Sequence, residues 1–314
     1  MKTNQTITSL DQATGPVLIP LTNDYLFRAL LQKNEHVLKG LICSLLHLRP
    51  DEVVSVKITN PIVLGETIDN KDFILDIRCL LNDNTIINLE MQVVNQYNWP
   101  ERSLSYLCRA FNNLESGQNY SLVKSAVQIG ILDFTLFPDA PEFYATYMMA
   151  NVKNHKIYSS KLRLSVLDLT HIDLATEEDR SHHIDYWASL FKAKTWEEIK
   201  MLAQKDSIIQ EASNTIIQLT QDEQIRQRCE ARADYLYWQK VEEAYKKELE
   251  ENYQQALQDN QQLQTEKQLM NSLTQLLLAD NRIEDLARST TDSAFQEQLL
   301  KEYRLIPDEV IRNK

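Results

Sequence analysis

The chain has 314 residues, 43% of them hydrophobic, and a formal net charge of -12. This is the composition of a globular protein, and the length corresponds to about two domains. Five glycines and eight prolines exclude a collagen-like or linker-rich chain. The four cysteines show no zinc-binding spacing, which fits a reducing cytoplasm. The first 18 residues resemble a flexible leader without a signal-peptide core, and no apolar run could span a bilayer. We therefore expect a cytoplasmic protein that does not bind membranes.

The negative charge is unevenly distributed. Residues 1–175 contain 15 Lys and Arg against 18 Asp and Glu, a net charge of -3, whereas residues 176–314 contain 18 against 27, a net charge of -9. Tight non-specific binding of nucleic acid depends on neutralising phosphates with basic side chains. Any nucleic-acid site must therefore be local, and we expect it in the first half of the chain.

The first 175 residues alternate between helix and strand patterns. A helix follows Pro20, with Thr22 or Asn23 as its N-cap, and a second ends before Pro50. Strand patterns and one further helix follow, and the clearest pair of strands flanks the turn Asn82–Asn84. The predicted segments are helix 36–48, strand 53–60, strands 73–81 and 85–94, helix 100–115, and strands within 122–137, 142–152 and 162–169. The order ααβββαβββ predicts an α/β fold with a mixed sheet flanked by helices.

From about residue 176 the strand patterns disappear, which predicts an all-α C-terminal region. A stretch over residues 222–278 has no proline or glycine and predicts one long helix. Apolar residues recur in it every seven positions, but the second set of positions that a coiled coil needs is polar. The helix therefore either packs against its own chain or forms a homo-oligomer. The repeating residues are Leu249, Ala256, Leu263, Met270 and Leu277, and the polar positions are Asn252, Asp259 and Glu266.

This organisation predicts four regions. A flexible leader over residues 1–18 precedes a mixed-sheet domain over residues 19–175. A helical region over residues 176–235 follows. The long helix and a short helical tail, over residues 236–314, could serve oligomerisation.

Two carboxylates lie inside the apolar strands of the predicted hairpin. Asp76 stands in FILDIRCLL and Glu90 in INLEMQVV, with Gln92 two residues later. Burying an unpaired charge is costly, so each needs a partner. Asp76 could pair with Arg78, Glu90 could pair with a basic helix residue such as Arg109, or either could face solvent. Alternatively, both carboxylates could hold Mg²⁺, which prefers oxygen ligands and can activate phosphoryl groups.

A shared site requires Asp76 and Glu90 to lie on one face of the sheet. Opposed residues of a hairpin share a face, so paired residue numbers must add up to an even number. A two-residue turn at Asp83 and Asn84 would instead set Asp76 opposite Met91. We therefore predict a three-residue loop, Asn82–Asn84, or a bulge that restores the parity.

The segments LDIR and NLEMQ form a D-X(n)-E-X-Q arrangement. Together with NDYLFRALL, NPIV, the R-x3-Y of Arg102 and Tyr106, and SGQNYSLVKSAVQIGILDFTLF, the arrangement resembles the PD-(D/E)XK nuclease superfamily over roughly residues 19–170. It most closely resembles the recombination-promoting nuclease branch, often called PD-(D/E)XK transposases. The resemblance implies a restriction-endonuclease-like fold and a Mg²⁺-dependent DNA endonuclease without a nucleotide cofactor. Asp76 and Glu90 would be its metal ligands. Gln92 replaces the superfamily's lysine and would orient water or a phosphate oxygen.

Other residues are weaker candidates. Asp24 lies where members of the superfamily often carry an auxiliary carboxylate, but it could simply favour a helix N-terminus. Arg102 and Arg109, with Tyr106 between them, could contact DNA phosphates or form salt bridges to the sheet carboxylates. His182 and His183 are expected in a solvated turn. A small basic cluster could contact DNA or merely be solvated; it comprises Lys153, Lys156, Lys161 and Arg163.

Three functions compete for this sequence. The first is an active DNA endonuclease, which the presence of Asp76, Glu90 and Gln92 favours. The second is a nuclease-fold protein with weak or no catalysis that acts as an interaction or assembly module. The third is a transposase that also joins strands, for which no sequence feature speaks.

Overall fold

The computed structural model describes residues 9–60 and 77–307. These residues fall into two compact units, with the boundary between residues 240 and 241. We call residues 9–240 the sheet unit and residues 241–307 the tail unit. Asp76, one of the two predicted metal ligands, lies outside the described residues.

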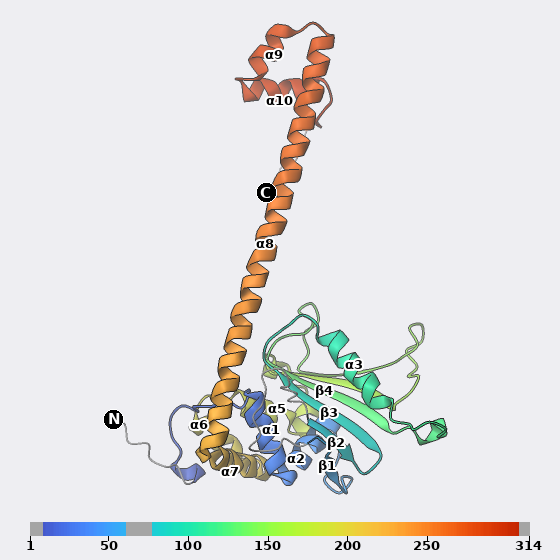
Figure 1. The fold of residues 1–314 in the computed structure, drawn as a ribbon, viewed down its shortest axis with the longest axis vertical. Coiled ribbons are helices and arrows are strands. Elements are labelled where there is room, and N and C mark those ends of the chain that lie inside the picture. Colours follow the sequence, from blue (N-terminus) through green and yellow to red (C-terminus); the bar gives the residue numbers. More distant parts are fainter. Residues whose placement is uncertain (1–8, 61–76, 308–314) are drawn as a thin grey trace. The chain divides into compact units, whose positions relative to one another are not determined.

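The described part of the sheet unit contains a six-stranded mixed sheet with the order β1-β2-β3-β4-β6-β5. The pairs β3–β4 and β4–β6 are parallel, and the other three pairs are antiparallel. The predicted mixed α/β sheet is therefore confirmed (Figure 1). The strands are β1 Val56–Ile58, β2 Ile77–Leu81, β3 Thr85–Gln92, β4 Ser125–Leu132, β5 Tyr144–Met148 and β6 Leu162–Asp168.

The predicted element order ααβββαβββ is also confirmed through β6. Its helices are α1 Asp24–Lys33, α2 Glu35–Leu46 and α3 Trp99–Phe111. The structure shortens α3 relative to the predicted 100–115. The side chain of Asn113 donates to the Ala110 and Phe111 carbonyl oxygens at 3.1 Å each, and satisfying these groups ends the helix.

Helices cover both faces of the sheet (Figure 1). The helix α3 packs on one face, where its Trp99 and Leu107 are buried with side chains of β3, β4 and β6. The opposite face is buried against α1, α2 and later helices. Burial there raises the pKa of the Cys79 thiol to about 12, so this cysteine stays protonated and unreactive. The core therefore has two layers, one on each side of the sheet.

The loop between β2 and β3 has three residues, as predicted. Leu81 pairs with Thr85 across it, and the left-handed backbones of Asn82 and Asp83 make the turn. The Asn82 side chain accepts from the Val54 amide at 2.8 Å and so ties the loop to the segment before β1. Every pair from Ile77 with Leu89 onward then has an even sum, which confirms the parity expected for the described part of the hairpin.

The helices after β6 belong to the same unit as the sheet. Their buried side chains, among them Trp187, Phe191 and Ile216, share one hydrophobic core with α1, α2 and the strands. The core thus continues across residue 175, where we expected a domain boundary. These helices are α4 Glu177–Ser181, α5 Ile184–Lys192, α6 Trp196–Ala203 and α7 Ser207–Gln221.

Residues 9–18, for which the sequence suggested a flexible leader, also contact this unit. Leu10 and Ala13 are buried in its core, and a short 3-10 helix spans Leu10–Gln12. The amide of Val17 donates to the Lys194 carbonyl oxygen at 2.8 Å. This segment therefore packs against the sheet unit instead of forming a free leader.

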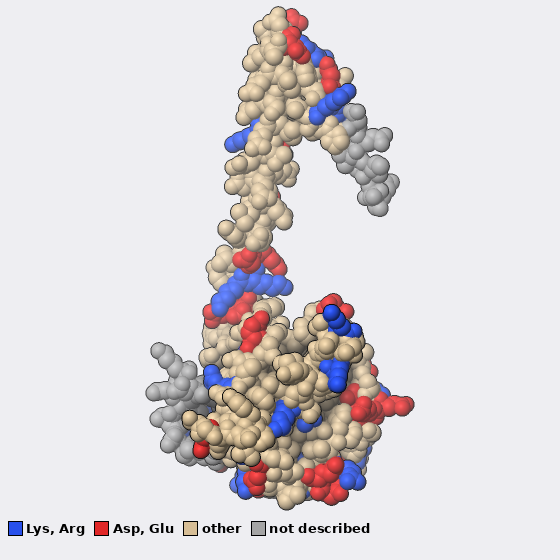
Figure 2. All heavy atoms as spheres, turned by 90° about the vertical axis from the view of Figure 1, so that its right-hand side faces the viewer, with Lys and Arg blue, Asp and Glu red and all other residues tan. Residues whose placement is uncertain are grey.

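The predicted long helix is confirmed as α8, Glu223–Ala279, whose residues belong to both units. In the tail unit its end packs with α9 Ile283–Ser289 and α10 Ser293–Glu302. Leu273 and Leu277 of α8 are buried there against Leu299. Charged side chains of both signs gather on one stretch of α8, and mostly uncharged ones follow it (Figure 2).

The seven-residue repeat of α8 was interpreted either as packing against the same chain or as self-association. Leu277 packs against its own chain, whereas Leu249 and Leu263 are 58% and 51% exposed. Self-association through the exposed part of the repeat stays a prediction.

Candidate active site on β3

Three polar side chains, Asn88, Glu90 and Gln92, alternate along β3 on the face that α3 covers. Asn88 and Glu90 are each only 5% exposed. The Asn88 amide donates to Gln128 Oε1 of β4 at 2.8 Å, whereas Gln128 Nε2 is buried and donates to none of the described residues. Asn88 was not among the predicted site residues, although its place between Ile87 and Leu89 is the same signal that marked Glu90.

Glu90 forms an ion pair with Arg102 on α3, with 2.6 Å between Glu90 Oε1 and an Arg102 terminal nitrogen. The Glu90 side chain is 7% exposed and the Arg102 side chain 37%. The carboxylate is thus buried while its partner reaches solvent. Of the pairings that the sequence left open, the structure shows Glu90 with a helix arginine, but with Arg102 instead of Arg109.

The position of Arg102 depends on close packing between α3 and β4. Gly130 lies beside Glu90 on the neighbouring strand. A Cβ atom at Gly130 would come within 2.1 Å of the Trp99 ring, so only glycine admits the tryptophan here. Trp99 is 1% exposed and starts α3, and Arg102 follows it by about one turn. The glycine therefore sets the height of α3 and the reach of Arg102 to Glu90.

Gln92 is the last residue of β3, and its side-chain nitrogen and oxygen differ in their hydrogen bonding. Its amide nitrogen donates to the Val94 carbonyl oxygen at 2.9 Å. Its oxygen Oε1 is buried and accepts no hydrogen bond from any described residue. A buried amide oxygen without a donor is available to a cation or to a water molecule. It fits the predicted role of orienting water better than a contact with a phosphate oxygen.

The remaining predicted DNA contacts cluster around Tyr106 on α3. The guanidinium carbons of Arg102 and Arg109 lie 5.5 and 5.9 Å from the centre of its ring. Arg109 is exposed. The structure therefore brings the three predicted residues together and leaves Arg109 open to solvent.

Asp24, the predicted auxiliary acid, is bound elsewhere. It is 4% exposed at the start of α1 and accepts two hydrogen bonds from Arg232 Nε, at 2.8 and 3.0 Å, and one from a terminal nitrogen at 2.5 Å. Arg232 was not predicted as its partner, because no local pattern links residues 208 positions apart. Asp24 therefore fixes the start of α8 within the sheet unit.

The two histidines expected in a solvated turn lie between α4 and α5 with defined contacts. The His182 ring stacks on His47, with centroids 4.4 Å apart, and His183 Nδ1 lies 2.5 Å from Asp206. Among the basic cluster, Lys153 and Lys156 are exposed, whereas Lys161 donates to the Val123 carbonyl oxygen at 2.8 Å.

Two further features are absent from the described residues. No group of three or more His, Cys, Asp or Glu side chains is arranged there to hold a metal ion. Nor does any helix of that part of the chain have the length and apolar character needed to cross a membrane.

Comparison with known proteins gives one match. The family model described as PD-(D/E)XK nuclease family transposase matches residues 21–246. The match extends well past β6, through α4–α7 and into α8. No curated protein and no solved structure matches the chain.

Proposed function

The chain belongs to the PD-(D/E)XK nuclease family transposases, and on this basis we propose that it is a Mg²⁺-dependent endonuclease that hydrolyses phosphodiester bonds in DNA. The observation that supports the proposal most is the pair Glu90 and Gln92. Both lie on one face of β3, one with a buried carboxylate and the other with a buried oxygen that accepts no hydrogen bond from the described residues. Such oxygen atoms suit Mg²⁺, a cation that binds carboxylates and keeps several waters.

Asp76 completes this proposed site. It precedes β2 by one residue, and the pairs of β2 with β3 sum to 166 from Leu81 with Thr85 to Ile77 with Leu89. Asp76 itself lies outside the described residues, and the even sum of the described pairs keeps the parity that a site shared with Glu90 requires. Asp76 and Glu90 would then hold the metal ion, and two carboxylates are enough protein ligands for Mg²⁺.

The other residues of the proposed site each have a role in the reaction. When bound, the ion would supply Lewis-acid polarisation of the scissile phosphate. Gln92 Oε1 accepts a hydrogen bond from the attacking water and orients it. Arg102 turns from Glu90 to a DNA phosphate, since its side chain reaches solvent. Tyr106 and exposed Arg109 extend the phosphate contacts along α3.

The ion pair between Arg102 and Glu90 favours a second candidate function. A guanidinium at 2.6 Å already neutralises the carboxylate that catalysis would need. In this candidate the protein keeps the nuclease fold, cleaves weakly or not at all, and acts as an interaction or assembly module.

Cleavage and metal binding together separate these candidates. We expect the full chain to nick or linearise supercoiled plasmid with Mg²⁺ and not with EDTA. Glu90→Gln and Asp76→Asn each lower the rate by at least about 100-fold, the scale of single groups that act on a transition state. Exposed Glu101→Gln on α3 is the matched control and keeps the wild-type rate.

Calorimetric titration with Mn²⁺ provides a second readout. Binding that Glu90→Gln abolishes, without any cleavage by the wild type, supports the non-catalytic candidate. Wild-type cleavage by Glu90→Gln refutes the assignment of this site.

A further inference from the structure

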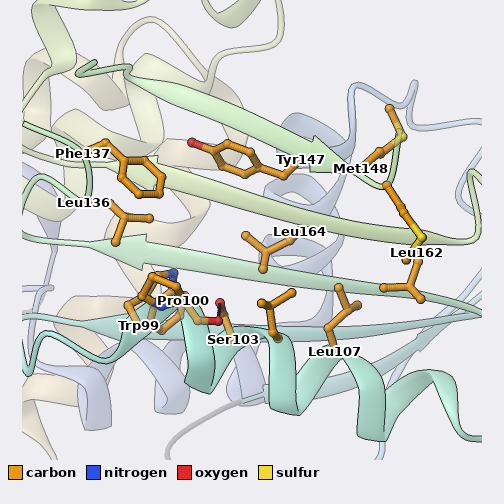
Figure 3. A pocket seen from close by; sticks show the side chains of 12 residues that line it. Trp99, Pro100, Ser103, Leu107, Leu136, Phe137, Tyr147, Met148, Leu162 and Leu164 are labelled. Atoms are coloured by element: carbon orange, nitrogen blue, oxygen red, sulfur yellow. Dashed lines mark hydrogen bonds between the residues drawn. The ribbon is translucent and has the colours of Figure 1, made fainter. Parts of the chain in front are cut away.

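An apolar pocket lies on the α3 side of the sheet, toward the strand β5 (Figure 3). Its volume is about 380 Å³. Side chains of α3 form one wall and residues of β5, β6 and the segment before β5 form the other. We call it the β5 pocket, and its walls include Trp99, Leu104, Phe137, Tyr147, Met149 and Leu164. Tyrosine, methionine and tryptophan are the residues that protein interfaces enrich.

The strand β5 next to this pocket is an edge of the sheet. Among the described strands it pairs only with β6. The Phe143 carbonyl oxygen accepts from the Asp168 amide at 2.8 Å, so Phe143 directs its backbone groups toward β6. Hydrogen-bonding direction alternates along an antiparallel strand. Tyr144, Thr146 and Met148 therefore direct their backbone N–H and C=O groups away from the sheet.

The two edges of the sheet differ in how they are protected. The strand β1 is three residues long, and its central Lys57 forms an ion pair with Asp83. Short length and an edge lysine are common ways to prevent edge-to-edge pairing. Along β5, by contrast, no charged residue or proline occurs from Phe143 to Val152. Tyr147 and Met149 are 40% and 60% exposed. This edge lacks the features that keep a strand unpaired.

We propose that β5 pairs in antiparallel fashion with β5 of a second copy of this chain. Charge complementarity supports the second copy as the partner. The uncharged segment is preceded by Glu142 and followed by Lys153. In an antiparallel pair of these strands centred on Tyr147, Glu142 lies opposite the partner's Val152, so it approaches the partner's Lys153 in the turn 152–154.

Pairing centred on Tyr147 also uses the outward backbone groups. Thr146 then lies opposite the partner's Met148, and both direct their backbone groups toward the new neighbour. Tyr147 shares the α3-facing side with Leu164, its partner on β6, so the two β5 pockets adjoin at the dimer axis. The interface buries both pockets and joins two sheets into one. It stands whether or not the protein cleaves DNA.

Equilibrium sedimentation of the full chain tests the proposal. We expect the wild type to be a dimer at micromolar concentration. Tyr147→Lys should raise the dissociation constant at least about 30-fold, as loss of an interface hot spot does. Met148→Pro should act in the same direction, because it removes an outward N–H that β6 does not use. Leu249→Lys on α8 is the matched control, since it adds the same charge to another exposed apolar residue.

Disulfide trapping reports the contact itself. Tyr147→Cys, made on a Cys108→Ser background because Cys108 is exposed, should form a covalent dimer on mild oxidation. Circular dichroism confirms that each variant is folded. A monomeric wild type would overturn the proposal, as would a dimer that only Leu249→Lys dissociates. A folded Tyr147→Cys variant that does not cross-link would exclude pairing centred on this residue.

Discussion

Within the described part of the sheet unit, two buried carboxylates, Asp24 and Glu90, are each bound by an arginine, and the two pairs differ in the exposure of the arginine. In the pair Asp24–Arg232, the side chains are 6% and 11% exposed. In the pair Glu90–Arg102 they are 7% and 37% exposed. Arg232 makes three hydrogen bonds to both oxygens of Asp24. Arg102 contacts Glu90 through Oε1, at 2.6 Å.

This difference separates a structural pair from an exchangeable one. Both partners of Asp24–Arg232 are largely shielded from water, so breaking the pair leaves a buried charge. In the proposed metal site, Arg102 would turn into solvent and the metal ion would take its place beside Glu90. Burial of a carboxylate inside a nuclease-like fold is therefore not enough to assign it to the proposed metal site. The exposure of the residue that it pairs with must also be considered.

The largest effect is expected from the fully buried pair, Asp24–Arg232. Asp24→Ala should lower the free energy of unfolding by about 3–5 kcal/mol, because it leaves Arg232 buried without its carboxylate. Urea unfolding followed by circular dichroism measures this change. Lys247→Ala, which breaks the exposed pair with Glu251, is the control and should change nothing measurable. A small loss of stability together with weakened Mn²⁺ binding would instead restore Asp24 as an auxiliary acid of the metal site.

The next largest effect tests how α3 is placed above Glu90. Gly130→Ala should cost about 1–3 kcal/mol, because its Cβ atom overlaps the Trp99 ring and forces α3 away from β4. Adding Trp99→Leu should recover part of the melting temperature that Gly130→Ala loses. If the double variant is as unstable as the sum of both changes, the ring is not the source of the strain.

For the partly exposed pair, Glu90–Arg102, we expect a smaller loss of stability and a distinctive response to metal. Arg102→Ala should cost about 1–2 kcal/mol, since it leaves Glu90 without this counter-charge while water can partly replace the exposed arginine. Millimolar Mn²⁺ should then raise the melting temperature of Arg102→Ala more than that of the wild type, because ion and arginine compete for the carboxylate. Equal shifts in both proteins would show that Arg102 does not compete with the ion.

The smallest effect concerns a third pair, His183–Asp206, in which the histidine is 46% exposed. Burial raises the pKa of Asp206, but hydrogen bonds from His183 and from the Ile209 and Ile208 amides outweigh it and hold the pKa below 3.8. Asp206→Asn keeps the helix cap and should cost about 0.5–1 kcal/mol at pH 6.

The pH dependence of that cost follows from the direction of the shift. At pH values above the ordinary pKa of an aspartate, the lowered pKa of Asp206 stabilises the folded state. This contribution is lost as the pH falls through the pKa of the folded state. The difference between wild type and Asp206→Asn should therefore shrink below about pH 4 in urea titrations. A difference that persists at lower pH would assign it to packing.

Local patterns in the sequence predicted most of the sheet unit. Alternation of apolar residues located the strands, and the parity argument predicted the loop Asn82–Asn84 that the structure confirms. Glu90 stood out as a carboxylate inside an apolar strand, and a salt bridge to a helix arginine, which the structure shows, was one of the alternatives that the sequence left open. These features could be predicted because they depend on residues close together in the chain.

Features that depend on distant residues could not be predicted in this way. Arg232 binds Asp24 across 208 positions. The choice of Arg102 over Arg109 depends on how closely Gly130 lets Trp99 approach. The β5 pocket combines residues from α3 and two later strands, and none of these segments looks unusual alone. A leader was expected over residues 1–18, which have no signal-peptide core, although Leu10 and Ala13 are buried.

The separation between Asp24 and Arg232 also sets an order of events during protein synthesis. At bacterial or eukaryotic elongation rates, a ribosome needs roughly 10–40 s to add 208 residues. Throughout that interval α1 carries a carboxylate whose partner has not been made, and Asn23 lacks the Cys229 carbonyl oxygen that it binds at 2.8 Å. The nascent sheet unit therefore closes only after the first turns of α8 have left the exit tunnel. A chain that ends before residue 232 leaves this core unfinished, and we expect it to open locally and to be cut by proteases more readily than the full chain.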